Sequence, residues 1–202
     1  MSLKLGKLEL DGKCHIMGIL NVTPDSFYDG GQHFDLVDTQ KRVDAMINEG
    51  AEIIDIGGES TRPGSKPVTA EEELERVIPA IEYVSENYDV PISIDTQKAE
   101  VAKKAVQAGA CIVNDVGGLR NEDMISVIAE MNVPVIIMHM QGTPENMQKH
   151  PHYDDVVEDI KEWLEERIKA AEKAGIKRSD IIVDPGIGFG KNLKHNLELL
   201  GR

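Results

Sequence analysis

The sequence has little cysteine, little basic charge and no long apolar run. No apolar stretch approaches the ~20 residues of a membrane span, and residues 1–13 mix Lys, Asp and Glu with Leu instead of forming a signal peptide. With 22 Lys and Arg against 36 Asp and Glu, the formal net charge is −14. A charge of this sign repels a phosphate backbone, which argues against nucleic acid as a partner.

The two cysteines, Cys14 and Cys111, each lie inside or next to an apolar, strand-like run. We interpret them as buried thiols in a reducing compartment, in preference to a disulfide, and therefore expect a cytoplasmic protein. What the sequence does contain is typical of a globular domain. The 202 residues are 41% hydrophobic, which excludes disorder and suffices for one domain with a core.

Six short apolar runs, too short for helices and rich in Ile and Val, predict strands buried on both faces of a parallel sheet: residues 16–20, 53–56, 91–94, 111–113, 135–138 and 181–183. Amphipathic patterns predict helices over residues 36–49, 70–87, 98–108, 124–131 and 153–174. Thr69 and Glu72 have the spacing of a capping box. Residues 3–10 alternate around Gly6 and Lys7, which predicts a hairpin covering the bottom of a barrel.

Every one of these strands is followed by polar or glycine residues: Asn21, Gly57-Gly58-Glu59, Asp95, Asn114-Asp115, His139 and Asp184. In a doubly wound sheet, site residues come from the two or three strands at the switch point, whereas in a (β/α)8 barrel all strand ends reach one rim. The pattern favours an α/β (β/α)8 TIM barrel. We expect residues 1–202 to be a single, C-terminally incomplete barrel domain with strands 1–6 present and strands 7 and 8 missing.

Asp95, Asn114 and Asp184 directly follow apolar strands, so their side chains are expected in the barrel mouth. Two carboxylates and an amide in a partly apolar cup are costly unless a ligand pairs with them. A ligand rich in N–H groups, such as the edge of a pterin or a purine, suits them. The alternative for Asp95 is that it caps the following helix.

Other motifs leave two interpretations open. The polar loops over residues 21–31 and 57–64 are either plain turns or mobile covers of a site. The glycine-rich segment 184–191 has neither the spacing nor the Ser/Thr of a P-loop, and its Lys191 either meets an anion or is solvated. His139 has no second His or Cys at ligand spacing, so a hydrogen-bonded structural histidine is favoured over a zinc ligand.

Six segments, in order and at strand ends, together resemble the dihydropteroate synthase family: residues 17–27, 55–64, 93–96, 114–116, 138–142 and 184–191. The resemblance implies that 6-hydroxymethyl-7,8-dihydropterin diphosphate condenses with p-aminobenzoate to give 7,8-dihydropteroate and diphosphate. It implies a catalytic and pterin-binding set of Asp95, Asn114 and Asp184, with Met138 as an apolar wall. It also implies p-aminobenzoate and loop contacts from Asp25, Thr61, Arg62, Pro63, Gly188 and Phe189.

By the same resemblance, Asn21 lies near Mg²⁺ and the diphosphate, sulfonamides compete for the p-aminobenzoate pocket, and the full-length protein is a homodimer. One departure is that the family's later Ser-Arg-Lys and Arg-x-His segments, which help to hold the pterin and diphosphate, are not in this sequence. Two alternatives therefore stay open. One is a pterin- or methyltetrahydrofolate-binding module of a methyltransferase, and the other is an inactive fragment.

Overall fold

The computed structural model describes residues 3–23, 36–60 and 67–202. Its centre is a sheet of six strands, in which every neighbouring pair is parallel. The strands are β3 (Met17–Asn21), β4 (Ile53–Gly57), β5 (Ile92–Asp95), β6 (Ile112–Asp115), β7 (Val135–Met138) and β8 (Ile181–Asp184). Their order in the sheet is their order in the chain. This order has no switch point, so it confirms the barrel arrangement over the doubly wound sheet.

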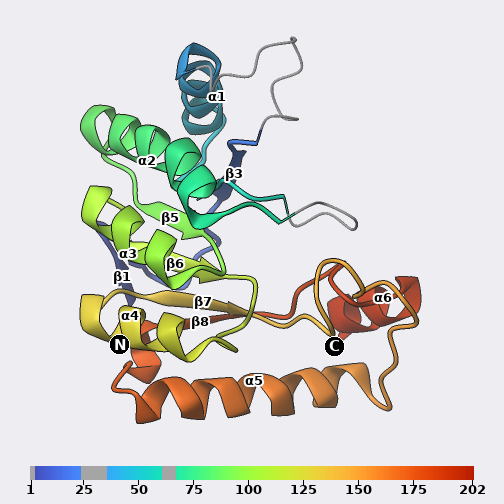
Figure 1. Ribbon diagram of the computed structural model, residues 1–202. Helices are drawn as coiled ribbons and strands as arrows, with labels where there is room; N and C mark the ends of the chain where they lie inside the picture. Colours follow the sequence, from blue (N-terminus) through green and yellow to red (C-terminus); the bar gives the residue numbers. More distant parts are fainter. Residues whose placement is uncertain (1–2, 24–35, 61–66) are drawn as a thin grey trace.

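Helices pack along one face of this sheet (Figure 1). They are α1 (Leu36–Asn48), α2 (Ala70–Asn87), α3 (Ala99–Ala108), α4 (Glu122–Met131) and α5 (Val156–Lys173). The last helix, α6 (Leu193–Gly201), lies beyond the carboxyl ends of β7 and β8, beside the start of α5. The main core joins strand residues such as Ile56 and Ile94 to helix residues such as Val77 and Ile128. The predicted capping box is confirmed, because the Thr69 side chain accepts from the Glu72 N–H and the Thr69 N–H donates to the Glu72 carboxylate.

The predicted strands are confirmed, but five of them, all except β7, end one or two residues later than expected. Asn21, Asp95, Asn114 and Asp184 are residues of the strands themselves and do not lie in the loops that follow. Polarity alone predicts that each strand ends before these residues. The backbone nevertheless continues its parallel pairing, because only the side chain needs to face the barrel interior. The fifth helix likewise begins at Val156, with Asp155 as its N-cap, and not at Tyr153.

The hairpin predicted over residues 3–10 is confirmed as antiparallel strands β1 (Leu3–Leu5) and β2 (Leu8–Leu10). Leu5 is buried in a second apolar cluster together with residues at or near the strand starts, namely Ile53, Ile112 and Ile136. The hairpin therefore closes the N-terminal end of the sheet, as expected. This leaves the opposite end, where the strands finish, for a ligand.

One expectation about the cysteines is wrong. Cys111 is half-buried beside the hairpin, but Cys14 is exposed. The apolar strand begins only at Met17, and Cys14 belongs to the surface connection between β2 and β3. Both thiols are free.

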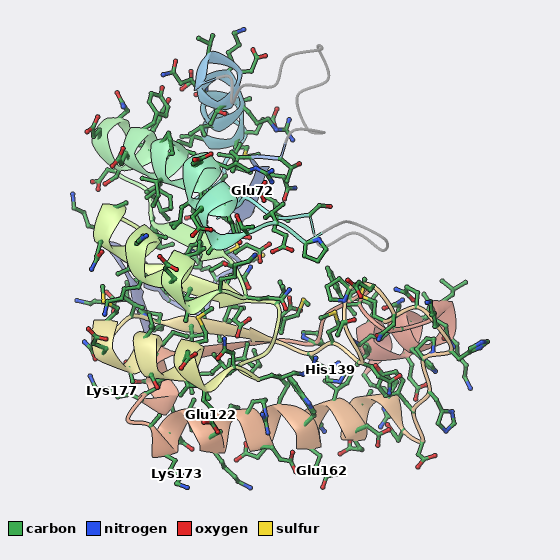
Figure 2. All side chains as sticks on the ribbon, in the orientation of Figure 1. Glu72, Glu122, His139, Glu162, Lys173 and Lys177 are labelled. Atoms are coloured by element: carbon green, nitrogen blue, oxygen red, sulfur yellow. The ribbon has the colours of Figure 1, made fainter. Side chains whose placement is uncertain are left out.

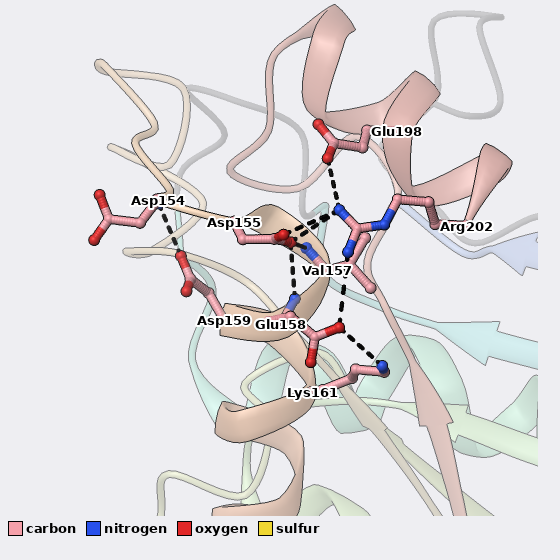
Figure 3. Close-up of polar contacts among 8 residues, drawn as sticks. All are labelled: Asp154, Asp155, Val157, Glu158, Asp159, Lys161, Glu198 and Arg202. Carbon is pink, nitrogen blue, oxygen red and sulfur yellow. Dashed lines mark hydrogen bonds and ion pairs between the residues drawn. The ribbon is translucent and has the colours of Figure 1, made fainter.

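Within the described residues, β3 and β8 each pair on one side only, so the sheet is open between them. Apolar side chains are exposed near these edges, including Ile19 and Val183, and on α6, including Leu193, Leu197 and Leu200. Arg202, which follows α6, links this helix to the start of α5 by binding Asp155, the N-cap of α5, and it also binds Glu198 within α6 (Figure 3). None of the described helices combines the length and the apolar character needed to cross a membrane.

Candidate functional site

The two-residue alternation of the strands places polar side chains in the barrel interior. In β4, Ile54 and Ile56 pack in the core under the helices, so Asp55 and Gly57 face the other side of the sheet. The same alternation turns Asp95 inward from β5 and Asn114 inward from β6. Strand register aligns Asn21, Gly57, Asp95 and Asn114 as direct neighbours in one row across four strands. This row lies at the carboxyl ends, where a barrel carries its site.

Gly57 gives the row its space. A Cβ at this position would lie 3.3 Å from Oδ2 of Asp95 and 3.7 Å from Oδ1 of Asn21. The two side chains therefore flank the glycine from either side. Asn21 is also an exposed residue, so its amide oxygen lies at the rim.

Asp95 has the most perturbed carboxyl of the row. Burial raises its pKa well above the ordinary value, and the negative charges of Asp55 and Glu73 raise it further. The alternative role of Asp95 as a helix cap is wrong, because Lys98 occupies the N-cap position of α3. Its carboxyl is therefore available to a ligand that donates hydrogen bonds.

Asp55 is a site residue that the sequence interpretation missed. It is 3% exposed, and its Oδ2 accepts a hydrogen bond from Nδ2 of Asn114 at 3.2 Å. Burial raises its pKa, and the side chains of Ser93 and Asn114 oppose that shift. The hydrogen bond fixes the amide of Asn114, so that its oxygen points away from Asp55. A single Asp inside an otherwise apolar strand, in phase with Gly57, was the signal available in the sequence.

Asp115 and Asp184 illustrate two different uses of a strand-end carboxylate. Both oxygens of Asp115 accept backbone N–H groups, from Gly117 at 2.7 Å and from Leu119 at 2.8 Å, so it shapes the following turn. The side chain of Asp184, by contrast, accepts a single hydrogen bond from the described residues, from the N–H of Gly186 to Oδ1 at 2.7 Å. Its other oxygen remains for a ligand.

An apolar cluster lies beside Asp184. Met138 stands directly opposite Asp184 in the pairing of β7 and β8. It is 3% exposed and packs with Val116, Met140 and Met147, against which Phe189 lies half-buried. The structure thus places the predicted apolar wall, Met138, next to a predicted pterin residue. Gly188 is exposed in the same loop as Phe189.

His139 and Lys191 form a buried pair behind this cluster. Lys191 is 3% exposed and its Nζ lies 3.0 Å from Nδ1 of His139, so the interpretation of Lys191 as a solvated side chain is wrong. Its contact with an anion stays a prediction. Burial, followed by the charge of Lys191, lowers the pKa of His139 to about 3. His139 is accordingly a neutral, hydrogen-bonded histidine, as favoured from the sequence. His139 lies above α5 in Figure 2. Its ring packs edge-on against Trp163, with 5.0 Å between the ring centroids.

The remaining predicted contacts belong to loops outside the described residues: Asp25, Thr61, Arg62 and Pro63. The described residues that precede residues 61–66 are firmly anchored. Lys98 bridges Glu59 and the fully buried Glu73, at 2.6 Å from the latter, and Nη1 of Arg76 donates to the carbonyl of Gly58 at 2.8 Å. In the described part of the chain, no three His, Cys, Asp or Glu side chains are grouped to hold a metal ion.

Fold and rim together define a (β/α)-barrel protein that carries carboxyl and amide side chains and an apolar cluster at its strand ends. Over residues 17–202 the chain matches the family described as "Pterin binding enzyme". It is 51% identical to the dihydropteroate synthase of Escherichia coli K12 over 188 residues, which are 93% of this chain and 67% of that protein. The chain therefore belongs to the dihydropteroate synthase family of pterin-binding enzymes.

Two solved structures agree. The Yersinia pestis dihydropteroate synthase, in complex with a sulfonamide drug, superposes with a TM-score of 0.93 at 46% identity, covering all of this chain and 74% of that one. The Xanthomonas albilineans dihydropteroate synthase, in complex with 7,8-dihydropteroate, gives a TM-score of 0.85 at 43% identity, covering all of this chain and 72% of that one. The chain thus spans about two thirds to three quarters of the length of these relatives.

Proposed function

We propose that the complete protein condenses 6-hydroxymethyl-7,8-dihydropterin diphosphate with p-aminobenzoate to form 7,8-dihydropteroate and diphosphate. The observation that carries the proposal is the inward row ending in Asp95 and Asn114, with Asp184 at the same end of the sheet beside the wall of Met138. A pterin presents several N–H donors on one edge and a flat apolar face. Carboxylate and amide oxygens accept the donors, and the methionine contacts the face.

The reaction begins when the bond between the pterin methylene carbon and the diphosphate oxygen breaks, and diphosphate leaves with the electron pair. The carboxylates of Asp95 and Asp184 stabilise the resulting cation by electrostatics in a site of low dielectric. The amine nitrogen of p-aminobenzoate then bonds to the carbon and loses a proton. Phe189, with the loop residues Asp25, Thr61, Arg62 and Pro63, is proposed to form the p-aminobenzoate pocket in which sulfonamides compete.

Asn21 is proposed as the protein's contact to Mg²⁺. Its amide oxygen is a hard donor at the rim, and one such donor suits a cation that otherwise binds water and diphosphate oxygens. Bound there, Mg²⁺ would supply charge neutralisation for the leaving diphosphate. We further propose a cytoplasmic homodimer. The dimer rests on the family resemblance.

The function is tested by incubating the purified full-length protein with both substrates and Mg²⁺ and detecting 7,8-dihydropteroate by mass. Its formation, and its loss when a sulfonamide is added, is the expected result. Pterin binding without any condensation product would contradict the proposal. That outcome would favour the binding-module alternative.

Pterin binding is expected to release a proton in the pH range between the ordinary pKa of an Asp and the raised pKa of Asp95. In the empty site, burial and the charge of Asp55 hold the pKa of Asp95 well above its usual range, so its carboxyl retains protons at pH values where an ordinary Asp has none. N–H donors of a bound pterin favour the ionised form, lower this pKa and expel the proton. Calorimetry of 7,8-dihydropterin binding in buffers of different ionisation enthalpy measures the release. The control is a repeat at a pH high enough to ionise Asp95 beforehand, where the buffer dependence should vanish. Identical enthalpies in all buffers throughout this pH range would contradict the expected proton release.

A further inference from the structure

The glycine-rich loop between β8 and α6 is fastened to the end of β7 by one buried ammonium group. Nζ of Lys191 donates to the carbonyl of Phe189 at 2.8 Å and contacts Nδ1 and the carbonyl oxygen of His139 at 3.0 and 3.3 Å. The three N–H bonds of the ammonium thus have three acceptors. One belongs to the loop and two belong to the residue that follows β7.

The loop approaches the chain after β7 very closely at two glycines. A Cβ on Gly186 would collide with the carbonyl oxygen of His139, and a Cβ on Gly190 would lie 2.8 Å from the carbonyl oxygen of Gln141. The hydroxyl of Tyr153 also donates to the carbonyl of Gly190 at 2.8 Å. Together with the bonds of Lys191, these close contacts hold the loop between β8 and α6 in one conformation.

The hydrogen-bond partners of Lys191 are all neutral, which is unusual for a buried cation. Burial lowers its pKa to about 8, and the charge of Asp184 opposes that shift only in part. A buried ammonium without a carboxylate partner contributes little to folding stability, because its desolvation cost is not offset by an ion pair. We therefore assign the ammonium of Lys191 to holding the conformation of the loop between β8 and α6, and not to stabilising the whole fold.

What this conformation positions is Phe189. Its carbonyl is held by Lys191 on one side, and its ring packs on the cluster of Met138, Met140 and Met147 on the other. Asp184, the last residue of β8, is held by its own bond from Gly186 and by the bond from the N–H of His139 to its carbonyl at 2.9 Å. Lys191 acts on Asp184 through its charge and through their shared neighbour His139, whereas it bonds to Phe189 directly. The contacts of Lys191 therefore bear on the phenylalanine more than on the carboxylate.

We propose that Lys191 is a positioning residue for the p-aminobenzoate half of the site, acting through Phe189 without touching either substrate. The inference rests on the proposed function, since it assigns Phe189 to the p-aminobenzoate pocket. A lysine that only stabilises the fold would affect both substrates alike. A lysine that positions Phe189 affects p-aminobenzoate selectively.

The test compares Lys191→Met with Lys194→Met in the full-length protein. Lys194 is an exposed lysine three residues further on, in α6. For Lys191→Met we expect the KM for p-aminobenzoate to rise about tenfold or more, while the KM for the pterin diphosphate stays within about twofold. For Lys194→Met, neither KM should change. Lys191→Gln, which keeps N–H donors but no charge, gives an intermediate KM for p-aminobenzoate and serves as the test if the methionine variant does not fold.

Equal increases in both KM values, or no increase in either, would overturn the role of Lys191 while leaving the proposed function in place. Failure of the unmodified protein to form dihydropteroate would instead remove the proposed function and this inference together. Melting temperatures of all variants are compared with that of the unmodified protein. A rise in the KM for p-aminobenzoate alone, at an unchanged melting temperature, supports the positioning role of Lys191.

Discussion

Replacing Asp184 with asparagine is expected to weaken binding of 7,8-dihydropterin about 100-fold while the fold is retained. Oδ1 of Asp184 already accepts the N–H of Gly186, so the second oxygen is the one left for a ligand. In Asp184→Asn, the amide oxygen keeps the loop contact and the NH₂ group turns toward the pterin. Donor then faces donor, and a charge-assisted hydrogen bond is lost, at a cost of about 3 kcal/mol.

Calorimetry with 7,8-dihydropterin measures this loss in the full-length protein, and circular dichroism checks the fold. Asp154→Asn is the matched control, because the Asp154 side chain is 98% exposed in the connection before α5. It should bind the pterin with unchanged affinity. An Asp184→Asn variant that binds as tightly as the control would remove Asp184 from the pterin site.

Replacing Gly186 with alanine is expected to lower the free energy of unfolding by about 3 kcal/mol. Gly186 has a φ of +66°, a left-handed conformation that costs an L-residue ~1 kcal/mol. Its added Cβ would also collide with the His139 carbonyl oxygen, a backbone atom with little freedom to move. Overpacking of this kind costs a further ~2 kcal/mol.

The matched control lies in the same loop. Gly188 has a φ of +87° but nothing within 4 Å of an added Cβ, so Gly188→Ala should cost only ~1 kcal/mol. Urea unfolding of both variants separates the collision from the conformational strain. Equal losses of stability would show that the close approach of Gly186 to His139 is not a constraint. A larger loss for Gly186→Ala should be accompanied by weaker pterin binding, because Asp184 directly precedes the displaced loop.

The sequence predicts the fold well, because short Ile- and Val-rich runs alternate with amphipathic helices, and polar residues at the end of every strand favour a barrel over a doubly wound sheet. Asp95, Asn114 and Asp184 were identified in this way, and the structure places all three at the same end of the sheet. What the pattern does not contain is the direction of each side chain. Asn114 and Asp115 are equally polar neighbours, and only strand register shows that the first faces the interior while the second caps a turn.

The roles of Asp55 and Lys191 illustrate the limits more clearly. Asp55 lies in the middle of an apolar strand, and polar residues at strand ends therefore do not point to it. Lys191 is separated from His139 by 52 residues in the sequence. The sequence therefore cannot show that this lysine, in a glycine-rich loop, is buried against His139. Both roles arise from tertiary packing, and both concern how predicted site residues are held.

The most direct test of the central claim is a structure of the full-length protein with a bound 7,8-dihydropterin. We expect the pterin N–H groups to lie within about 2.7–3.2 Å of the carboxylate or amide oxygens of Asp95, Asn114 and Asp184. The pterin ring should pack against Met138. A pterin bound away from the strand ends, leaving these side chains without contact, would contradict it.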